Sequence, residues 1–93
     1  MSVEGSVTVH HIKGLHARPA SVFVNTASEF ESEIRVGKTG ADELVDAKSS
    51  LAIMSLGVEE GDEITITANG ADSEQAIKRL ITIVEADFEL HQE

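Results

Sequence analysis

The sequence predicts an α+β fold, an open-faced sandwich in which helices cover one face of a four-stranded sheet. Three observations lead to this prediction. Apolar and polar residues alternate with a period of two near the start of the chain and again past its middle. Two longer stretches instead repeat their apolar residues at helical spacing, and turns rich in glycine or polar residues separate the segments. The resulting order of elements is β-α-β-β-α-β-α.

Length and composition limit the classes of protein that fit. A chain of 93 residues has room for one domain, which we expect to span residues 1–93. The net charge of −10 would repel nucleic-acid phosphates, and three phenylalanines are too few for base stacking. There is no cysteine, no basic-then-apolar leader and no apolar run of membrane-spanning length. We therefore expect a soluble, cytoplasmic monomer without nucleic-acid partner or membrane insertion.

The first strand is expected over residues 3–10, where valines alternate with polar residues. A loop at residues 11–14 follows, and its glycine permits a sharp turn. His10, His11 and His16 do not predict a metal site, because adjacent residues at a strand end point to opposite faces and no cysteine supports them. We expect neither a metal nor a cofactor.

The heptapeptide GLHARPA at residues 14–20 holds the strongest candidate site. Pro19, the only proline, favours the first turn of a helix, so a helix should begin between Ala17 and Pro19. The unpaired N–H groups of that turn would form an anion site at the positive end of the helix dipole. His16 would lie at its mouth as a neutral, nucleophilic imidazole, and Arg18 could pair with phosphate oxygens. This set suits a histidine that carries a phosphoryl group, although a capping or surface histidine is the simpler interpretation.

The first helix and a hairpin should follow this segment. From Ala20 the apolar residues lie at i, i+3, i+4 and i+7, which predicts a helix with one buried face that extends to about Glu29. Two β-prone pieces at residues 33–36 and 43–47 flank the sequence GKTG at residues 37–40, and a hairpin is the simplest account of them.

The second half of the chain predicts a short helix, a strand and a long helix. Ser49 is suited to N-cap a helix over residues 50–56 that stops at Gly57. A polar turn leads to a strand that ends at Asn69-Gly70. Asp72 and Gln75 have capping-box spacing and predict the start of a final helix to near residue 89. The apolar stripe of that helix comprises Ile77, Leu80, Ile81, Val84 and Phe88.

These segments resemble the histidine-containing phosphocarrier protein family HPr, of the phosphoenolpyruvate-dependent sugar phosphotransferase system. The heptapeptide is similar to the family's active-site segment, and AKSSLAIMSLG at residues 47–57 is similar to its regulatory-serine segment. The sequence EITITANGAD at residues 63–72 resembles its last strand and turn. The resemblance covers nearly the whole chain, and it implies an HPr-like fold with an antiparallel sheet.

The resemblance also implies a function. In that family, phosphoenolpyruvate phosphorylates enzyme I, which passes the phosphoryl group to Nδ1 of the HPr histidine, which passes it to a sugar-specific enzyme IIA. His16 would be the phosphohistidine and Arg18 would stabilise the phosphate, in a phosphotransferase chain rather than a stand-alone enzyme. Ser49 matches a serine that an HPr kinase phosphorylates in many members. The partner surface would comprise Ala17, Ser21, Ser50, Leu51 and Met54, with Ser50 in place of the family's usual large apolar residue.

Other functions remain open at this stage. A regulatory HPr paralogue would bind its targets without phosphotransfer, but such proteins can lack the histidine that this chain retains beside Arg18. Nitrogen-regulatory and dihydroxyacetone-kinase branches use related carriers. A small-ligand-binding module is disfavoured because the sequence has no glycine-rich phosphate loop.

The acid excess predicts a further property. Seventeen acidic residues face seven basic ones, and their mutual repulsion would weaken the fold unless salt screens it. We therefore expect a halophile's acidic surface, and a surface tuned to a basic partner is the alternative.

Overall fold

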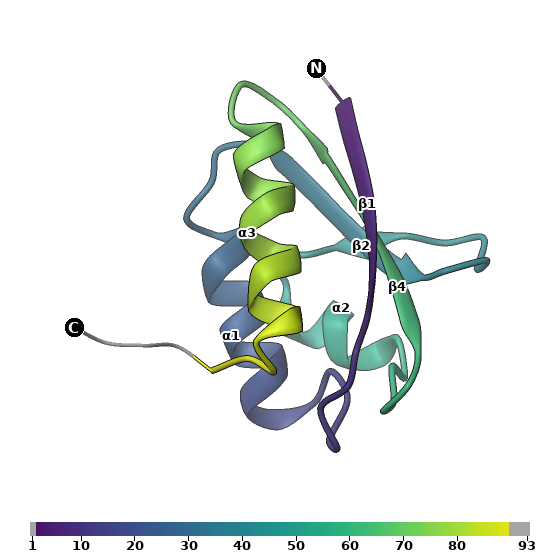
Figure 1. Ribbon diagram of the computed structural model, residues 1–93. Helices are drawn as coiled ribbons and strands as arrows, with labels where there is room; N and C mark the ends of the chain where they lie inside the picture. Colours follow the sequence, from purple (N-terminus) through teal and green to yellow (C-terminus); the bar gives the residue numbers. More distant parts are fainter. Residues whose placement is uncertain (1, 90–93) are drawn as a thin grey trace.

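The computed structural model describes residues 2–89 and has the predicted order of elements (Figure 1). These are β1 (Ser2–Thr8), α1 (Ala17–Ala27), β2 (Glu33–Lys38), β3 (Val45–Asp46), α2 (Ser50–Ser55), β4 (Glu63–Asn69) and α3 (Ser73–Glu85). The strands form one antiparallel sheet in the order β1-β4-β2-β3. Helices α1 and α3 lie against one face of the sheet, and α2 packs against α1 (Figure 1). The open-faced sandwich is confirmed.

The core lies between the sheet and the two long helices. Alternate residues of β4, Ile64, Ile66 and Ala68, are at most 1% exposed, as the period of two predicts. Phe23 of α1 and Leu80 of α3 are fully buried from the other side. Burying each large apolar side chain contributes about 1.5–3 kcal/mol, so this aliphatic layer fixes the helices firmly on the sheet. Within residues 2–89, no helix has both the length and the apolar character to cross a bilayer.

Two element ends differ from the prediction. β1 ends at Thr8, although Val9 continues the pairing outside the regular strand: its N–H donates to the carbonyl of Asp62 (2.8 Å), and its carbonyl accepts from Gly61 (2.7 Å). The polar turn before β4 is therefore tied to the chain just ahead of the heptapeptide. Helix α1 ends at Ala27, two residues earlier than expected.

The hairpin is confirmed, but its second strand is short. Arg35 lies opposite Asp46 and Val36 opposite Val45, and only these two pairs form. The prediction of a strand over residues 43–47 was therefore too long, and residues 37 and 38 belong to β2 rather than to the turn.

The short helix α2 follows the prediction closely. The hydroxyl of Ser49 accepts a hydrogen bond from the N–H of Ala52 (3.2 Å), so Ser49 is the N-cap. The helix ends one residue early, at Ser55, and Gly57 has a φ of +70°, the left-handed conformation expected of glycine just after a helix.

The capping box predicted at Asp72 was wrong. Asp72 is the N-cap of α3 by position, but its side chain makes no capping bond. The carboxylate instead accepts hydrogen bonds from the N–H groups of Glu31 (2.9 Å) and Ser32 (3.0 Å) and from the Ser32 hydroxyl. The Ser32 hydroxyl, followed by the Glu31 amide, holds the pKa of Asp72 below its ordinary value of 3.8. Asp72 therefore joins the start of α3 to the loop between α1 and β2.

The end of α3 also differs from the prediction. The helix stops at Glu85, so Phe88 does not belong to its stripe. Asp87 and Phe88 have φ values of 61° and 63°, and the N–H of Phe88 donates to the carbonyl of Ile83 (2.8 Å). This reversal returns the Phe88 ring to the core, where it is 2% exposed.

Candidate functional site

The loop that carries His16 is fixed to a neighbouring loop by its backbone. Gly14 has a φ of +61°, and a Cβ there would lie 2.1 Å from the carbonyl oxygen of Val58. Leu15 is fully buried, and its N–H donates to the same carbonyl (3.1 Å). Only glycine fits this close approach, so the Gly-Leu pair sets where the next residue, His16, enters α1.

The Val58 loop is held in turn by Asp62. One oxygen of its carboxylate accepts from the N–H of Glu59 (2.9 Å) and lies 3.4 Å from Nζ of Lys38. The Glu59 amide, helped by Lys38, holds the pKa of Asp62 below its ordinary value. The support beneath Leu15 is thus itself a hydrogen-bonded turn.

His16 immediately precedes α1, at the helix start where the sequence places it. It is the N-cap residue, with extended backbone (φ −129°, ψ 165°), and it is half-buried. Its imidazole makes no capping hydrogen bond, so neither ring nitrogen is occupied by the helix cap. The first N–H groups of a helix have no intrahelical partner, and Pro19, in the first turn, has none to donate.

Ala17 has an unexpected conformation. Its φ is +53°, in the left-handed region that costs a non-glycine residue about 1–2 kcal/mol. Helical backbone therefore starts one residue later, at Arg18. Alanine is the best helix former, so no residue preference in the sequence indicates this conformation.

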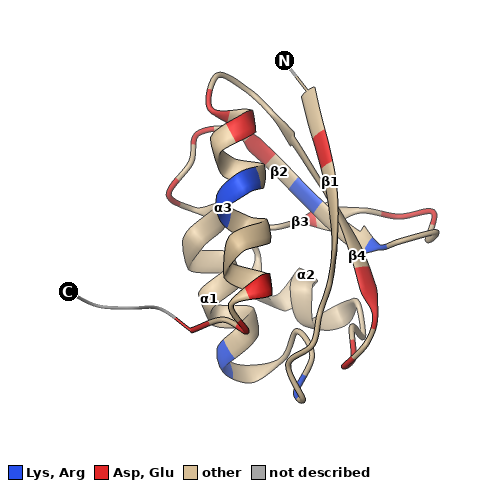
Figure 2. Ribbon diagram, viewed as in Figure 1, with Lys and Arg blue, Asp and Glu red and all other residues tan. Residues whose placement is uncertain are grey.

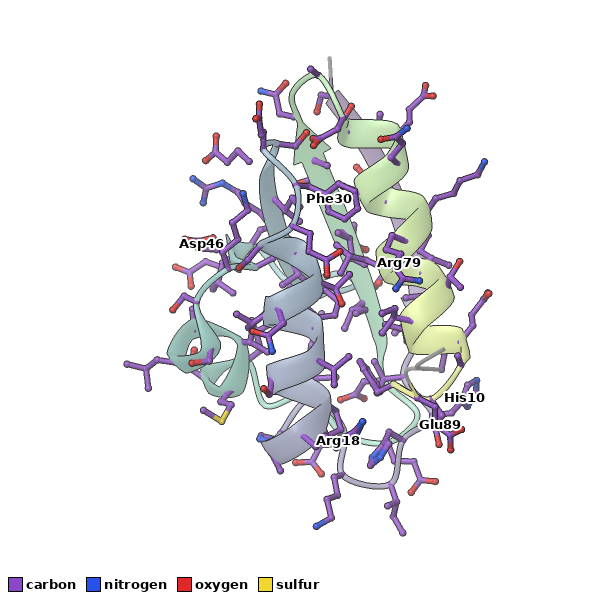
Figure 3. All side chains as sticks on the ribbon, turned by 90° about the vertical axis from the view of Figure 1, so that its left-hand side faces the viewer. His10, Arg18, Phe30, Asp46, Arg79 and Glu89 are labelled. Atoms are coloured by element: carbon purple, nitrogen blue, oxygen red, sulfur yellow. The ribbon has the colours of Figure 1, made fainter. Side chains whose placement is uncertain are left out.

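Arg18 is exposed, and within the part of the chain that the structure describes its side chain forms no ion pair or hydrogen bond. Figure 3 shows its side chain at the end of α1 where the helix begins. The first turn of α1 contains no acidic residue, and Figure 2 shows basic positions at this end of α1 and in the loop beside it. The positive charge of an unpaired guanidinium is unfavourable near the positive end of the helix dipole. A bound anion would therefore be stabilised here.

A shallow groove of about 390 Å³ separates α1 from α2. It brings together four of the five predicted partner residues, Ala17, Ser21, Ser50 and Met54, with Ala20, Val24 and Asn25. The fifth, Leu51, lies on α2 outside the groove and is 77% exposed. Sequence reasoning missed Ile12, which is 78% exposed in the loop before His16. An isolated isoleucine between a histidine and a lysine in a predicted loop could have indicated an exposed apolar contact residue.

The histidines do not converge. Within residues 2–89, no cluster of three or more histidine, cysteine or acidic side chains is arranged to hold a metal ion. His10 is exposed, whereas the ring of His11 packs on Phe88 at the end of the described chain.

Comparison with known proteins identifies the family. The family model described as the PTS HPr component phosphorylation site matches residues 3–86. The chain belongs to the HPr family. This membership makes it an HPr-family phosphocarrier of the phosphotransferase system, and it implies partners within that system.

Similar proteins include two kinds of HPr relative. The phosphocarrier protein HPr of Haloferax volcanii is 43% identical over 82 residues, which cover 88% of this chain and 92% of the relative. The HPr-like protein Crh of Bacillus subtilis is 39% identical over 85 residues, which cover 91% and 98%. A crystal structure of HPr from Bacillus anthracis matches with a TM-score of 0.82 and 42% identity over 89% of this chain and 96% of its own.

The hydroxyl of Ser49, the predicted regulatory serine, is engaged in the cap of α2. Ser49 is half-buried, while Ser50, next to it, is exposed at the edge of the groove. The serine segment therefore lies beside the predicted partner surface, although some 30 residues of sequence separate it from His16.

Proposed function

We propose that this chain is a phosphoryl carrier that accepts a phosphoryl group on Nδ1 of His16 from enzyme I and passes it to a sugar-specific enzyme IIA. It would act in the cytoplasm as a single-domain monomer. The observation that carries the proposal is the open start of α1: a histidine at the N-cap whose ring caps nothing, with an unpaired arginine two residues on.

Each part has a chemical role in the transfer. The Nδ1 lone pair attacks phosphorus in line as the bond to the donor breaks, so the protein needs to position and stabilise charge more than to activate a bond. The N–H groups of Ala17 and Arg18 and the Arg18 guanidinium can donate to the phosphoryl oxygens. The site is at a helix tip rather than in a pocket, which lets two partners reach the same nitrogen in succession.

The groove, together with exposed apolar side chains on α2 and in the loop before His16, would supply a docking surface for those partners. Leu51 and Ile12 are more than three-quarters exposed and Met54 is 40% exposed, and they occur on α2 and on the loop that precedes His16. Exposed apolar side chains around a polar centre are typical of a protein interface. Ser50 would weaken the apolar contact relative to the family pattern.

Purified enzyme I with phosphoenolpyruvate tests the proposal. Wild type should gain one phosphate, which mass spectrometry under alkaline conditions should localise to His16. His16→Ala should gain none, while His10→Ala, a change at an exposed histidine outside the site, should be labelled like wild type. A His16→Ala protein that still accepts phosphate would refute the assignment.

A second, regulatory role through Ser49 is the alternative, and a similar solved structure is described as the Bacillus subtilis catabolite repression HPr. Phosphate at this helix start would be compatible with the dipole but would add charge beside the groove, and it would replace the existing cap. We expect Ser49→Asp to keep the fold and to weaken binding to enzyme I by about tenfold, and Ser49→Thr to bind normally. Titration calorimetry with enzyme I measures this. Equal affinity of wild type and Ser49→Asp would leave Ser49 as a cap only.

Labelling by enzyme I separates a carrier from a purely regulatory protein, and transfer to purified acceptors separates the carrier branches. A purely regulatory paralogue would bind its targets without being labelled by enzyme I. Carriers of the nitrogen-regulatory or dihydroxyacetone-kinase branches would be labelled, but would pass the group to a different acceptor than a sugar-specific enzyme IIA.

A further inference from the structure

His11 and the three residues after it form a hydrogen-bonded turn just ahead of the site. The N–H of Gly14 donates to the carbonyl of His11 (2.8 Å), which closes the turn. The N–H of Lys13 donates to Nδ1 of the His11 ring (3.1 Å). A backbone N–H can only donate, so this ring nitrogen carries no proton, and the proton of the neutral imidazole is on Nε2.

A histidine is unusual in this role. The first position of such a turn favours Asp, Asn and Ser, because their short side chains accept from the N–H two residues on. Nδ1 of histidine is bonded to Cγ in the same way as Oδ1 of asparagine. His11 therefore supplies the same acceptor at the same distance along the side chain.

The other side of the His11 ring is fixed by the C-terminal turn. Its centroid lies 6.0 Å from that of Phe88, with the ring planes at 74°, an edge-to-face contact. Phe88 is itself buried and bonded to the end of α3. Figure 3 labels the sequence neighbours of the pair, His10 and Glu89, at one corner of the molecule. The ring is thus held between its own loop and the end of α3.

We propose that His11 is a positioning residue for phosphotransfer at His16. Its acceptor and its contact with Phe88 fix the turn that delivers Gly14 to the Val58 carbonyl. From there Leu15 is buried and His16 enters α1. A loosened turn would leave His16 free to depart from in-line geometry, to which transfer rates are sensitive. The inference rests on the proposed function.

Three variants test the proposal. His11→Leu keeps an apolar contact with Phe88 but has no acceptor. His11→Asn keeps the acceptor and loses the ring. His10→Leu is the matched control at the exposed neighbour. Each is measured for single-turnover transfer from phosphorylated enzyme I, for thermal midpoint, and for hydrogen exchange of the Lys13 amide.

We expect His11→Leu to transfer roughly tenfold more slowly, and its Lys13 amide to exchange faster by a similar factor. His11→Asn should restore transfer and Lys13 protection to within about threefold of wild type, a rescue that a merely structural ring would not show. Wild-type rates in His11→Leu, or an equal loss in His11→Leu and His11→Asn, would overturn the proposal. If wild type itself is not labelled, the proposed function fails instead, and Lys13 exchange in the variants still decides whether His11 holds the turn.

Discussion

The starts of α1 and α3 lie at opposite ends of the helical layer and are built in opposite ways (Figure 1). At α3, Asp72 accepts three hydrogen bonds from the loop beside it, and Glu74 in the first turn adds a favourable negative charge. At α1, His16 caps nothing, and the first turn has Arg18 in place of an acid. Neither helix start has a side-chain cap, but the Asp72 carboxylate at the α3 start is already bonded within the protein. The α1 start instead has a histidine without a capping role and an unpaired cation, which a transient anion can use.

The comparison also shows how an open helix start can be placed accurately. The α1 start has no side-chain cap, so its position depends on backbone contacts, above all the approach of Gly14 to Val58. The α3 start is located by a side chain instead. Backbone contacts before the helix can therefore fix the position of the α1 start while its first N–H groups stay free to bind a phosphoryl group.

The largest expected effect is the loss of stability when a side chain is added at Gly14, where the backbone approaches Val58. Gly14→Ala should destabilise the fold by about 2–4 kcal/mol, because the new Cβ would meet the Val58 carbonyl and the residue has positive φ. Gly40→Ala is the matched control, with φ +90° but no atom within 4 Å, and should cost about 1 kcal/mol. Urea unfolding measures both. Similar losses in the two variants would mean that backbone contact does not position α1.

Removing the cation at the open start should affect function alone. Arg18→Ala should slow transfer by about 10–100-fold, since a hydrogen bond to a charged group contributes about 1.5–3 kcal/mol. Its thermal midpoint should stay within a few degrees of wild type, because Arg18 has no partner in residues 2–89. Arg35→Ala, on β2, is the control. Unchanged rates to and from both partners would show that the α1 start does not need this charge.

At the start of α3, the bonds of Asp72 should make the stability of the fold depend on pH in the acid range. The pKa of Asp72 is lowered in the folded state, so its contribution to stability is present above the unfolded pKa and is lost as pH falls through the folded pKa. Wild type should therefore lose stability progressively as the pH falls below about 5. Asp72→Asn should be less stable at neutral pH and flatter across that range, with transfer from enzyme I retained. Asp42→Asn, in an exposed loop, is the control for urea titrations. A parallel pH dependence in both variants would contradict the role of Asp72.

The smallest effect concerns the acid excess, which leaves the α1 start as one of the few places with basic residues (Figure 2). Raising salt from about 0.1 M to 1 M shortens the Debye length from roughly 10 Å to about 3 Å. If the surface suits a salt-rich cytoplasm, the thermal midpoint should rise by several degrees in potassium chloride over that range. A flat midpoint would favour the alternative that the acidic surface docks basic partners.

Local rules in the sequence were enough for most of the fold. Alternation, helical spacing and the caps at Ser49 and Gly57 depend on neighbouring residues, and the structure follows them. The failures involve distant partners. The bonds of Asp72 to Ser32 and the return of Phe88 to the core depend on contacts far along the chain, which no spacing rule contains.

Some features of the candidate site could likewise be predicted from neighbouring residues, and others could not. The sequence predicts that a helix begins just after His16, with Arg18 in its first turn, because Pro19 and the resemblance mark the place. The positive φ of Ala17 and the bond from the Lys13 N–H to the His11 ring could not be foreseen, because alanine favours a helix and histidine is not a usual acceptor at the start of a turn.

Amide NMR of the phosphorylated and unphosphorylated protein tests the central claim, that the start of α1 is kept open for a phosphoryl group on His16. On phosphorylation by enzyme I, the amide protons of Ala17 and Arg18 should move downfield as they donate to the phosphoryl oxygens. Those of Ala52 and Ser32, which already donate to Ser49 and Asp72, should not move. Unmoved amides at Ala17 and Arg18 in a protein phosphorylated on His16 would contradict the account.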